Sequence, residues 1–546
     1  MDLQKENKMG TMPPGRLLLS MSLPMILSML VQALYNVVDS YFVAMTGLEA
    51  LTAVSQAFSA QNLIIGIATG TAVGVNALLS KALGEKNFNR VNKIAHNGVL
   101  LAFLGYFAIL LFGLFGTEAY FNGILSTAEL KSGLNIASVK ESGIAYLEIC
   151  SIGSVFIFVQ IMFERLMQST GRTIYTMYAQ GIGALMNIML DPLFILDELP
   201  FFGIRGFGLG ATGAALATVI GQAAGCVLAI LLNTKYNADI RLTLRNLKPD
   251  WKIIGGIYAI GVPSIIMVSI GSVMYYLMNI ILMGVSSYSA SIFGVYFKLQ
   301  SFVFMPLFGM NNGVIPIIAY NFGAKRRRRM IQTTKFAMLY AFGFMAVGTL
   351  LMQLIPNVLL QLFIDDSAVV ALGCTALRII SLSFALAGFG IVISSVFQAL
   401  GHGFYSMLVS IVRQLLVLIP TAYLLSLSGN LDLIWWSFPI AEIASATVSA
   451  LLYIRLYKKP SGIFRSDKMR RRISPVRENP DRRFLLPRGI HKATPAEICQ
   501  NCRFSAAIKT TKTVLRHVRT DKARPSICRI CPTFCATLNI VVQNAY

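Results

Sequence analysis

Charged residues are scarce in this 546-residue chain, at 13% of all positions, whereas hydrophobic residues make up 55%. With a mean hydropathy of +0.65, this composition excludes a soluble globular protein of such length. Histidine occurs four times, at expected loops or near the end of the chain: His96, His402, His491 and His517. No nucleophile and base motif occurs, so we expect no enzyme. No Gly-x-x-x-x-Gly-Lys-Ser/Thr loop occurs either, which excludes ATP hydrolysis by this chain as an energy source.

Apolar stretches long enough to cross the hydrocarbon core of a bilayer recur as far as residue 457. Since the backbone in hydrocarbon must satisfy its own hydrogen bonds, we predict an all-α polytopic membrane protein. The first stretch is too long for the core of a cleavable signal, so we expect it to remain. The expected spans number twelve: 17 to 45, 51 to 80, 94 to 116, 140 to 168, 173 to 196, 207 to 232, 253 to 285, 288 to 322, 332 to 355, 368 to 400, 404 to 428 and 432 to 457.

Basic residues gather on alternate connections, for example Lys86 after the second span and 325 to 329 after the eighth. The positive-inside rule assigns these connections to the cytoplasm, and with them both termini. The other connections carry mainly acids. The expected division is a cytoplasmic N-terminus (1–16), a six-helix bundle (17–232), a cytoplasmic linker (233–252), a second six-helix bundle (253–457) and a basic cytoplasmic tail (458–546).

The two bundles resemble each other in sequence. The pattern Gln-x-x-Gly-x-x-x-Tyr-x-Met occurs twice, as Gln168, Gly171, Tyr175 and Met177 and again as Gln398, Gly401, Tyr405 and Met407. A second register pairs Pro24 with Pro263, Gly70 and Gly74 with Gly309 and Gly313, Gly84 with Gly323, and Lys86 with Lys325. Because each half has six spans, the repeats are expected to be parallel, with a cavity between them. Duplicated membrane halves are typical of alternating-access carriers.

The tail differs from the rest of the chain. Residues 458–546 contain twenty Lys and Arg against five Asp and Glu, which is +15 of the chain's +23. Two cysteine pairs, Cys499 with Cys502 and Cys528 with Cys531, have the appearance of a zinc site. The gap between the pairs is too long for a zinc ribbon and lacks turn glycines, so we expect no metal. Basicity alone does not indicate a nucleic-acid partner, and composition favours a disordered, dispensable extension.

Five segments taken together resemble the multidrug and toxic compound extrusion family over residues 10 to 457. They are Pro24 to Asp39, Gly70-x-x-x-Gly74, Gln168-x-x-Gly171, Asn187-x-x-x-Asp191-Pro192 and Gly213 to Thr218. The run Gly313 to Phe322 is similar to the Gram-positive, staphylococcal branch. The resemblance implies a multi-pass protein of the bacterial cell membrane that exports small organic cations in exchange for protons or sodium. We expect it to act as a monomer without a cofactor.

Two acids in the first half need an explanation, because a carboxylate in hydrocarbon costs at least about 2.5 kcal/mol. Asp39 and Asp191 are expected at similar depth, and Asn36 and Asn187 each share a helical face with one of them. Desolvation and a like-charged neighbour disfavour ionisation, so one acid should carry an exchangeable proton. In the family, the residues matching Asp39, Asn187, Asp191 and Thr218 bind the coupling cation. The same oxygens suit sodium, so the coupling ion stays open.

The second half lacks these acids. The repeat pairs Asp39 with Met278 or Asn279, and Asp191 with Thr421. Charged residues expected within its spans include Lys298, Arg413 and Glu442, and we predict that Glu442 pairs with one of the two cations as a structural or gating contact. Further candidates for the cavity or its gates are the repeated residues Gln168, Tyr175, Met177 and Gln398.

One rival function remains open. Related carriers with a duplicated architecture flip lipid-linked oligosaccharides or polar lipids across the membrane. A flippase would favour a strongly cationic groove for phosphate, whereas the sharpest cluster in this sequence is acidic. The sequence therefore favours cation export.

Overall fold

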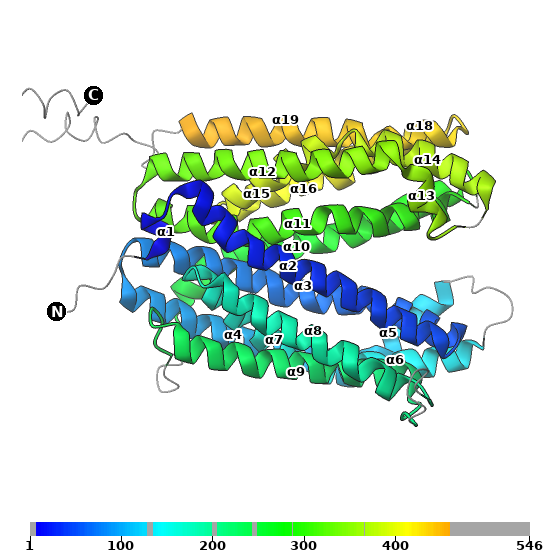
Figure 1. The fold of residues 1–546 in the computed structure, drawn as a ribbon, viewed down its shortest axis with the longest axis horizontal. Helices are drawn as coiled ribbons and strands as arrows, with labels where there is room; N and C mark the ends of the chain where they lie inside the picture. Colours follow the sequence, from blue (N-terminus) through cyan, green and yellow to red (C-terminus); the bar gives the residue numbers. More distant parts are fainter. Residues whose placement is uncertain are drawn as a thin grey trace, which may run out of the picture. The chain divides into compact units, whose positions relative to one another are not determined.

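The computed structural model describes residues 7–127, 135–198, 205–242, 248–286, 288–364 and 366–458 (Figure 1). The cysteine pairs of the tail lie outside these residues. The helices of the first lobe are α1 (Lys8–Thr11), α2 (Pro14–Met45), α3 (Leu48–Gly84), α4 (Phe88–Phe115), α5 (Thr117–Thr127), α6 (Ile136–Ile152), α7 (Ser154–Ser169), α8 (Thr173–Ile195) and α9 (Gly210–Tyr236).

The second lobe repeats this order of long helices. Its members are α10 (Trp251–Met283), α11 (Ser289–Gly323), α12 (Arg327–Leu354), α13 (Pro356–Gln361), α14 (Ser367–Ser381), α15 (Phe384–Ala399), α16 (Gly403–Ile411), the π-helix η2 (Val412–Leu418), α17 (Ile419–Ser426), α18 (Leu431–Trp435) and α19 (Ser437–Lys458). Figure 1 shows the two lobes as layers of roughly parallel helices, with α2 and α3 lying against α10 and α11.

The predicted all-α fold with twelve transmembrane helices is confirmed. In the described part of the chain, nine helical segments are long and apolar enough to cross a bilayer on their own. Two further spans are bent pairs: α6 and α7 meet at 44°, and α14 and α15 meet at 47°. The twelfth span is α8, a helix of 23 residues that includes Asn187 and Asp191.

The backbone repeats as the sequence register predicts. Lys86 and Lys325 both adopt φ of 59°, the only two positive φ values outside glycine among the described residues. Gly171 and Gly401 share φ of 84°. Left-handed φ is unfavourable for residues with a Cβ, so its recurrence at matched positions reflects the same helix-ending turn in both lobes.

Glycines allow the lobes to approach each other closely. A Cβ at Gly74 would overlap the carbonyl oxygen of Ile257 in α10, and one at Gly84 would overlap that of Tyr320 in α11. Gly323 stands in the reciprocal position against the Lys81 carbonyl. These contacts lie toward the end of the membrane body where α2 begins and where α3, α11 and α19 end. We call this the basic end, and the opposite end, where α2 stops, the acidic end.

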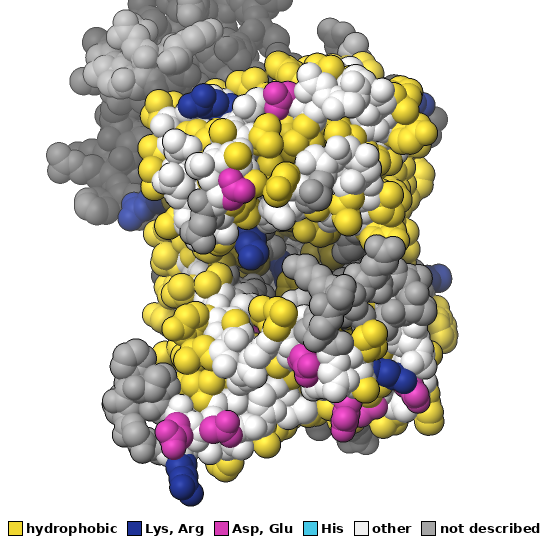
Figure 2. Space-filling model, turned by 90° about the vertical axis from the view of Figure 1, so that its right-hand side faces the viewer, with side chains coloured by type: hydrophobic (Ala, Val, Ile, Leu, Met, Phe, Trp, Pro, Cys, Tyr) yellow, Lys and Arg dark blue, Asp and Glu magenta, His cyan; other side chains and the backbone are white. Residues whose placement is uncertain are grey.

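The N-terminal segment joins both lobes at the basic end. Asn7 donates to the Thr170 carbonyl of the first lobe at 2.9 Å, whereas the Met9 carbonyl accepts from Asn321 and Arg329 of the second lobe at 3.1 and 3.2 Å. At the acidic end, by contrast, the surface is hollowed between the two lobes, as Figure 2 shows. The described lobes are thus in close contact at one end and parted at the other.

Candidate functional site

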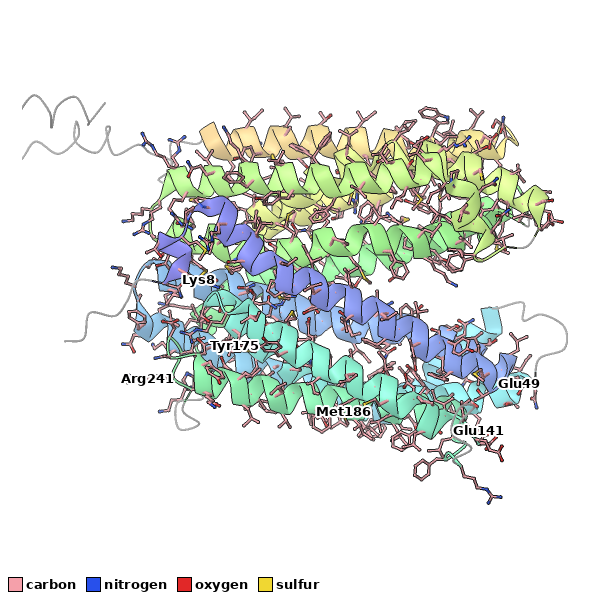
Figure 3. The ribbon with its side chains drawn as sticks, viewed as in Figure 1. Lys8, Glu49, Glu141, Tyr175, Met186 and Arg241 are labelled. Carbon is pink, nitrogen blue, oxygen red and sulfur yellow. The ribbon has the colours of Figure 1, made fainter. Side chains whose placement is uncertain are left out.

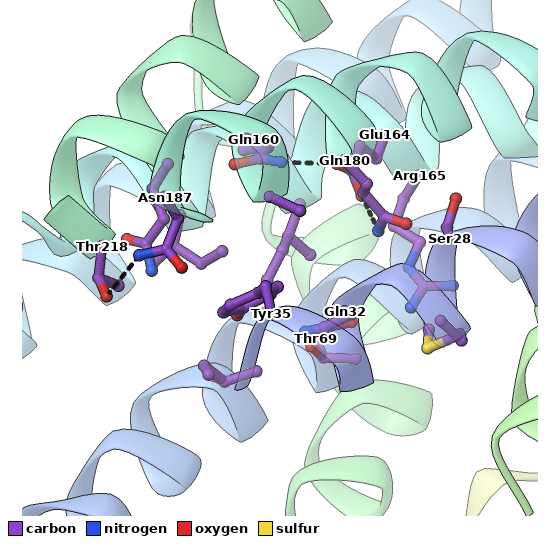
Figure 4. Close-up of a pocket in the computed structure, with 17 residues that line it drawn as sticks. Ser28, Gln32, Tyr35, Thr69, Gln160, Glu164, Arg165, Gln180, Asn187 and Thr218 are labelled. Atoms are coloured by element: carbon purple, nitrogen blue, oxygen red, sulfur yellow. Dashed lines mark hydrogen bonds between the residues drawn. The ribbon is translucent and has the colours of Figure 1, made fainter. Parts of the chain in front are cut away.

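A cavity of about 210 Å³ lies within the first lobe, between α2, α3, α7, α8 and α9. Its lining is unusually polar for a membrane interior. Figure 4 shows two groups of polar side chains at its two ends, with Tyr35 of α2 between them. One group contains Asn187 and Thr218, and the other contains Gln160, Glu164 and Gln180.

Asp191, Asn187 and Thr218 form one connected cluster. The Asn187 amide nitrogen donates to Asp191 Oδ1 at 3.0 Å and to Thr218 Oγ1 at 3.4 Å. Asp191 is 0% exposed, so its carboxylate lies behind Asn187, which lines the cavity. The spacing of four residues along α8 brings acid and amide together, and α9 supplies the hydroxyl. The structure therefore brings together three of the five residues predicted for the coupling site.

Asp39 lies on α2, which packs against α8, and it makes no hydrogen bond to this cluster among the described residues. It is half-buried. Asn36 is exposed on the same helix, and its carbonyl, not its side chain, accepts from Ser40 at 2.9 Å. Asp191, Asn187 and Thr218 are thus joined by hydrogen bonds, whereas Asp39 and Asn36 take no part in these bonds. The side chain of Asn36 is placed less deeply than the sequence pattern predicts.

Three side-chain oxygens of the predicted coupling residues have no hydrogen-bond partner in the described part of the chain. Among the described residues, Asp39 Oδ1, Asp191 Oδ2 and Asn187 Oδ1 are buried and without a hydrogen-bond partner. All three atoms are acceptors, and unsatisfied buried acceptors are costly. A small cation with hard-ligand preference, or a proton on one carboxylate, would satisfy them. No three His, Cys, Asp or Glu side chains of the described residues are grouped as a metal site would require.

The second group at the cavity was missed by the sequence reading. Glu164 of α7 is 3% exposed, and its two carboxylate oxygens accept from the amide nitrogens of Gln160 at 3.0 Å and Gln180 at 2.7 Å. The available signal was an acid inside the expected span 140 to 168, which by itself warrants attention in a membrane.

Arg165 lies beside Glu164 in sequence but turns toward the second lobe. Its Nη1 donates to Gln168 at 2.9 Å and to Asn312 of α11 at 2.7 Å. This places the predicted candidate Gln168 in a contact between the lobes, where it helps to hold a buried guanidinium, and not on the cavity wall.

The other candidates of the repeat motif lie apart from this cavity. Tyr175 stacks on Tyr236 of α9 with ring centroids 4.6 Å apart, near the basic end (Figure 3). Met177, half-buried on α8, is also absent from the lining residues. In the second lobe, Gln398 contacts the sulfur of Met267 at 3.7 Å.

Arg413 and Glu442 form an ion pair in the second lobe, with 3.2 Å between Nη1 and Oε1. Arg413 is carried by the π-helix η2, a distortion of the kind that often re-aims a side chain. Lys298 is exposed and lies over the ring of Phe363 at 5.6 Å. Of the two pairings predicted for Glu442, the structure therefore contains the one with Arg413.

Comparison with known proteins gives consistent results. The MatE family model matches residues 24–193 and 263–424. The chain is 24% identical over 436 residues to the multidrug export protein MepA of Staphylococcus saprophyticus, covering 79% of this chain and 91% of that protein. It is also 24% identical over 445 residues to MepA of a Staphylococcus aureus strain, covering 81% and 93%.

Solved structures share the fold. An outward-facing multidrug resistance MATE transporter superposes with a TM-score of 0.75 at 23% identity, covering 83% of this chain and 98% of that one. A transporter from Pyrococcus furiosus, described as having a binding pocket of reverse polarity, gives 0.73 at 23% identity, covering 83% and 99%.

Proposed function

The chain belongs to the MatE family of multidrug and toxic compound extrusion transporters, and from this premise we propose that it exports small organic cations in exchange for protons or sodium ions. The observation that carries the proposal is the set of three buried, unpaired oxygens on Asp39, Asp191 and Asn187 beside a polar cavity. Three unpaired acceptor atoms in a membrane interior, two of them on carboxyl groups, favour a positively charged occupant.

Exchange requires that the two cations compete. The coupling cluster opens onto the cavity through Asn187 and Thr218, and both lie on its wall. A small cation or proton at Asp39 and Asp191 neutralises the charge that would attract an organic cation into the same space. Because like charges repel strongly in a medium of low dielectric constant, occupancy of the two positions is mutually exclusive.

Alternating access requires two lobes that can part at either end. The close glycine contacts at the basic end and the hollow at the acidic end support an arrangement that is open on one side of the membrane. With the basic connections on the cytoplasmic side, that open side is the outer one. The chain then lies in the bacterial cytoplasmic membrane with both termini inside. In this proposal the two bundles that move relative to each other are those expected from the sequence, residues 17–232 and 253–457.

Transport of ethidium by the purified chain in proteoliposomes tests the proposal. We expect accumulation when a pH gradient or a sodium gradient is imposed, and none without a gradient. One proton exchanged for one monovalent cation moves no net charge, so about tenfold accumulation per pH unit is expected, independent of membrane potential. A response to potential would indicate more than one coupling ion per substrate.

Asp191→Asn tests the coupling cluster, because it removes a charge from it. Glu141→Gln is its control, because it removes a charge from an exposed position on α6. Equal ethidium transport with and without either gradient, in the unmodified chain, would contradict coupled export.

A further inference from the structure

The carboxylate of Glu164 accepts hydrogen bonds from two side-chain amides and thereby fixes their orientation. An ionised carboxylate only accepts hydrogen bonds, so the amide nitrogens of Gln160 and Gln180 must face it, at 3.0 and 2.7 Å. The amide oxygens must then point away. In Figure 4 the oxygen of Gln160 is turned from Glu164 toward the Asn187 end of the cavity.

Both amide oxygens lack a partner. Gln160 Oε1 and Gln180 Oε1 are buried and make no hydrogen bond within the described residues, although Gln160 is only 6% exposed. A buried amide without its acceptor contact costs about 1–3 kcal/mol. Two such atoms beside one carboxylate form a set of acceptors on the cavity wall that a donor could fill.

The neighbouring guanidinium of Arg165 does not donate to these acceptors. Arg165 donates to Gln168 and Asn312, and among the ion pairs of the described residues none joins it to Glu164. Figure 4 shows its side chain leading away from the Glu164 carboxylate. Arg165 lines the same cavity, but its hydrogen bonds go to Gln168 and Asn312, and it donates none to Glu164, Gln160 or Gln180.

We propose that Glu164, Gln160 and Gln180 form a recognition site for the N–H-donating cationic group of the exported compound, such as an amidinium, a guanidinium or a protonated amine. The inference rests on the proposed function and narrows its substrate class. The carboxylate supplies the charge, and the two amide oxygens supply directional acceptors. A quaternary or phosphonium cation satisfies the charge but leaves both oxygens unpaired, so it binds less tightly for its size.

The site occupies the end of the cavity opposite the coupling cluster, with Tyr35 between the two (Figure 4). The aromatic ring can lie against the flat body of a cation whose donating group reaches Glu164, which is worth about 0.5–2 kcal/mol. Both cation positions therefore belong to a single enclosed space. The substrate is recognised by its N–H groups at one end and competes by its charge with the ion at the other.

Equilibrium dialysis of the purified full-length chain tests this directly. The two probes are 4′,6-diamidino-2-phenylindole, which carries two amidinium groups, and tetraphenylphosphonium, which has no N–H. Glu164→Gln should raise the Kd of the amidinium probe at least about tenfold, as expected for loss of a charge-assisted hydrogen bond. The Kd ratio of the two probes should shift by at least about fivefold against the amidinium. Gln160→Met removes the acceptor oxygen at similar volume, together with the amide donor to Glu164, and should shift this ratio in the same direction by about threefold.

Glu141→Gln is the matched control, because it makes the same exchange at an exposed position of α6 and should leave the ratio unchanged. An equal weakening of both probes by Glu164→Gln and Gln160→Met, or no weakening of either, would overturn the recognition site. Should Glu164→Gln fail to fold, judged by gel filtration, the ratio measured with Gln160→Met decides. Selective amidinium binding without gradient-driven transport would support the recognition site but contradict the proposed export function.

Discussion

The two lobes share a backbone plan but differ in chemistry. Lys86 and Lys325, 239 positions apart, adopt the same left-handed φ, and the glycine contacts of α3 on α10 and α11 on α2 are reciprocal. The first lobe nevertheless holds three acids around one cavity. In the second lobe Glu442 forms an ion pair with Arg413. The close glycine contacts recur in both lobes, whereas the acids of the first-lobe site are not repeated at the matched positions of the second.

The difference follows from what each feature requires. Close packing of helices depends on small residues at fixed places on both sides of an interface, so the repeat is retained there. A cation site of the kind proposed depends on an uncompensated carboxylate, which is costly in hydrocarbon, so we expect no second copy of it. The residues that the two registers pair with these acids are accordingly uncharged: Met278 or Asn279 with Asp39, and Thr421 with Asp191.

The largest effect is expected from the acids of the first lobe. Asp39→Asn or Asp191→Asn should reduce gradient-driven efflux to the background of empty liposomes, because neither variant retains the pair of exchangeable charges. Introducing an acid in the second lobe, as Asp191→Asn with Thr421→Asp, should not restore transport. The measurement is ethidium uptake at matched protein content. Normal transport by both single variants would remove the basis for the asymmetry of the lobes.

The glycine contacts should instead respond equally in the two lobes. Gly84→Ala and Gly323→Ala each force a Cβ against a backbone oxygen of the other lobe, and such overpacking costs about 1–3 kcal/mol. We expect similar losses of thermal stability in detergent, measured by intrinsic fluorescence, and slower transport in both. Gly343→Ala is the control, since nothing lies within 4 Å of its added Cβ. Strongly unequal losses would show that the interface is not reciprocal.

The ion pair of the second lobe should matter for stability more than for coupling. Arg413 and Glu442 are 26% and 13% exposed in their side chains, so removal of either partner should cost about 2 kcal/mol, less than for a fully buried pair. The double variant Arg413→Met with Glu442→Leu should regain part of this loss. The pH dependence of transport should stay that of the unmodified chain. A shifted pH profile in Glu442→Gln would give the second lobe a role in coupling.

The smallest effect is expected from the tail, which belongs to neither lobe. Deletion of residues 461–546 removes most of the chain's excess positive charge and should leave the rate of ethidium transport within about twofold, since no residue of the coupling site or of the Glu164 site lies there. Efflux that collapses on deletion, with normal insertion in the membrane, would make the tail part of the transport cycle.

Sequence reasoning predicted the fold more completely than the site. The twelve spans and the two registers follow from apolar length and from repeated glycines, both of which are local signals. Asp191 and Asn187 were recognised because an acid and an amide four residues apart share a helical face, whereas Thr218 was named only through the family resemblance. Glu164 was overlooked because its partners, Gln160 and Gln180, become meaningful only when α7 and α8 pack against each other. Tyr175 and Met177 repeat in the second half but do not line this cavity, a distinction that a motif alone cannot make.

By itself the sequence determined that this protein is a duplicated twelve-helix membrane bundle with acids in its first half, because hydrocarbon permits few ways to satisfy a backbone and makes every charge conspicuous. Only the tertiary structure decided which oxygens remain unpaired, that Arg165 donates to Asn312 and not to Glu164, and that Asn187 and Glu164 line the same cavity. These outcomes depend on the relative rotation and distance of helices far apart in the chain, which no local pattern encodes.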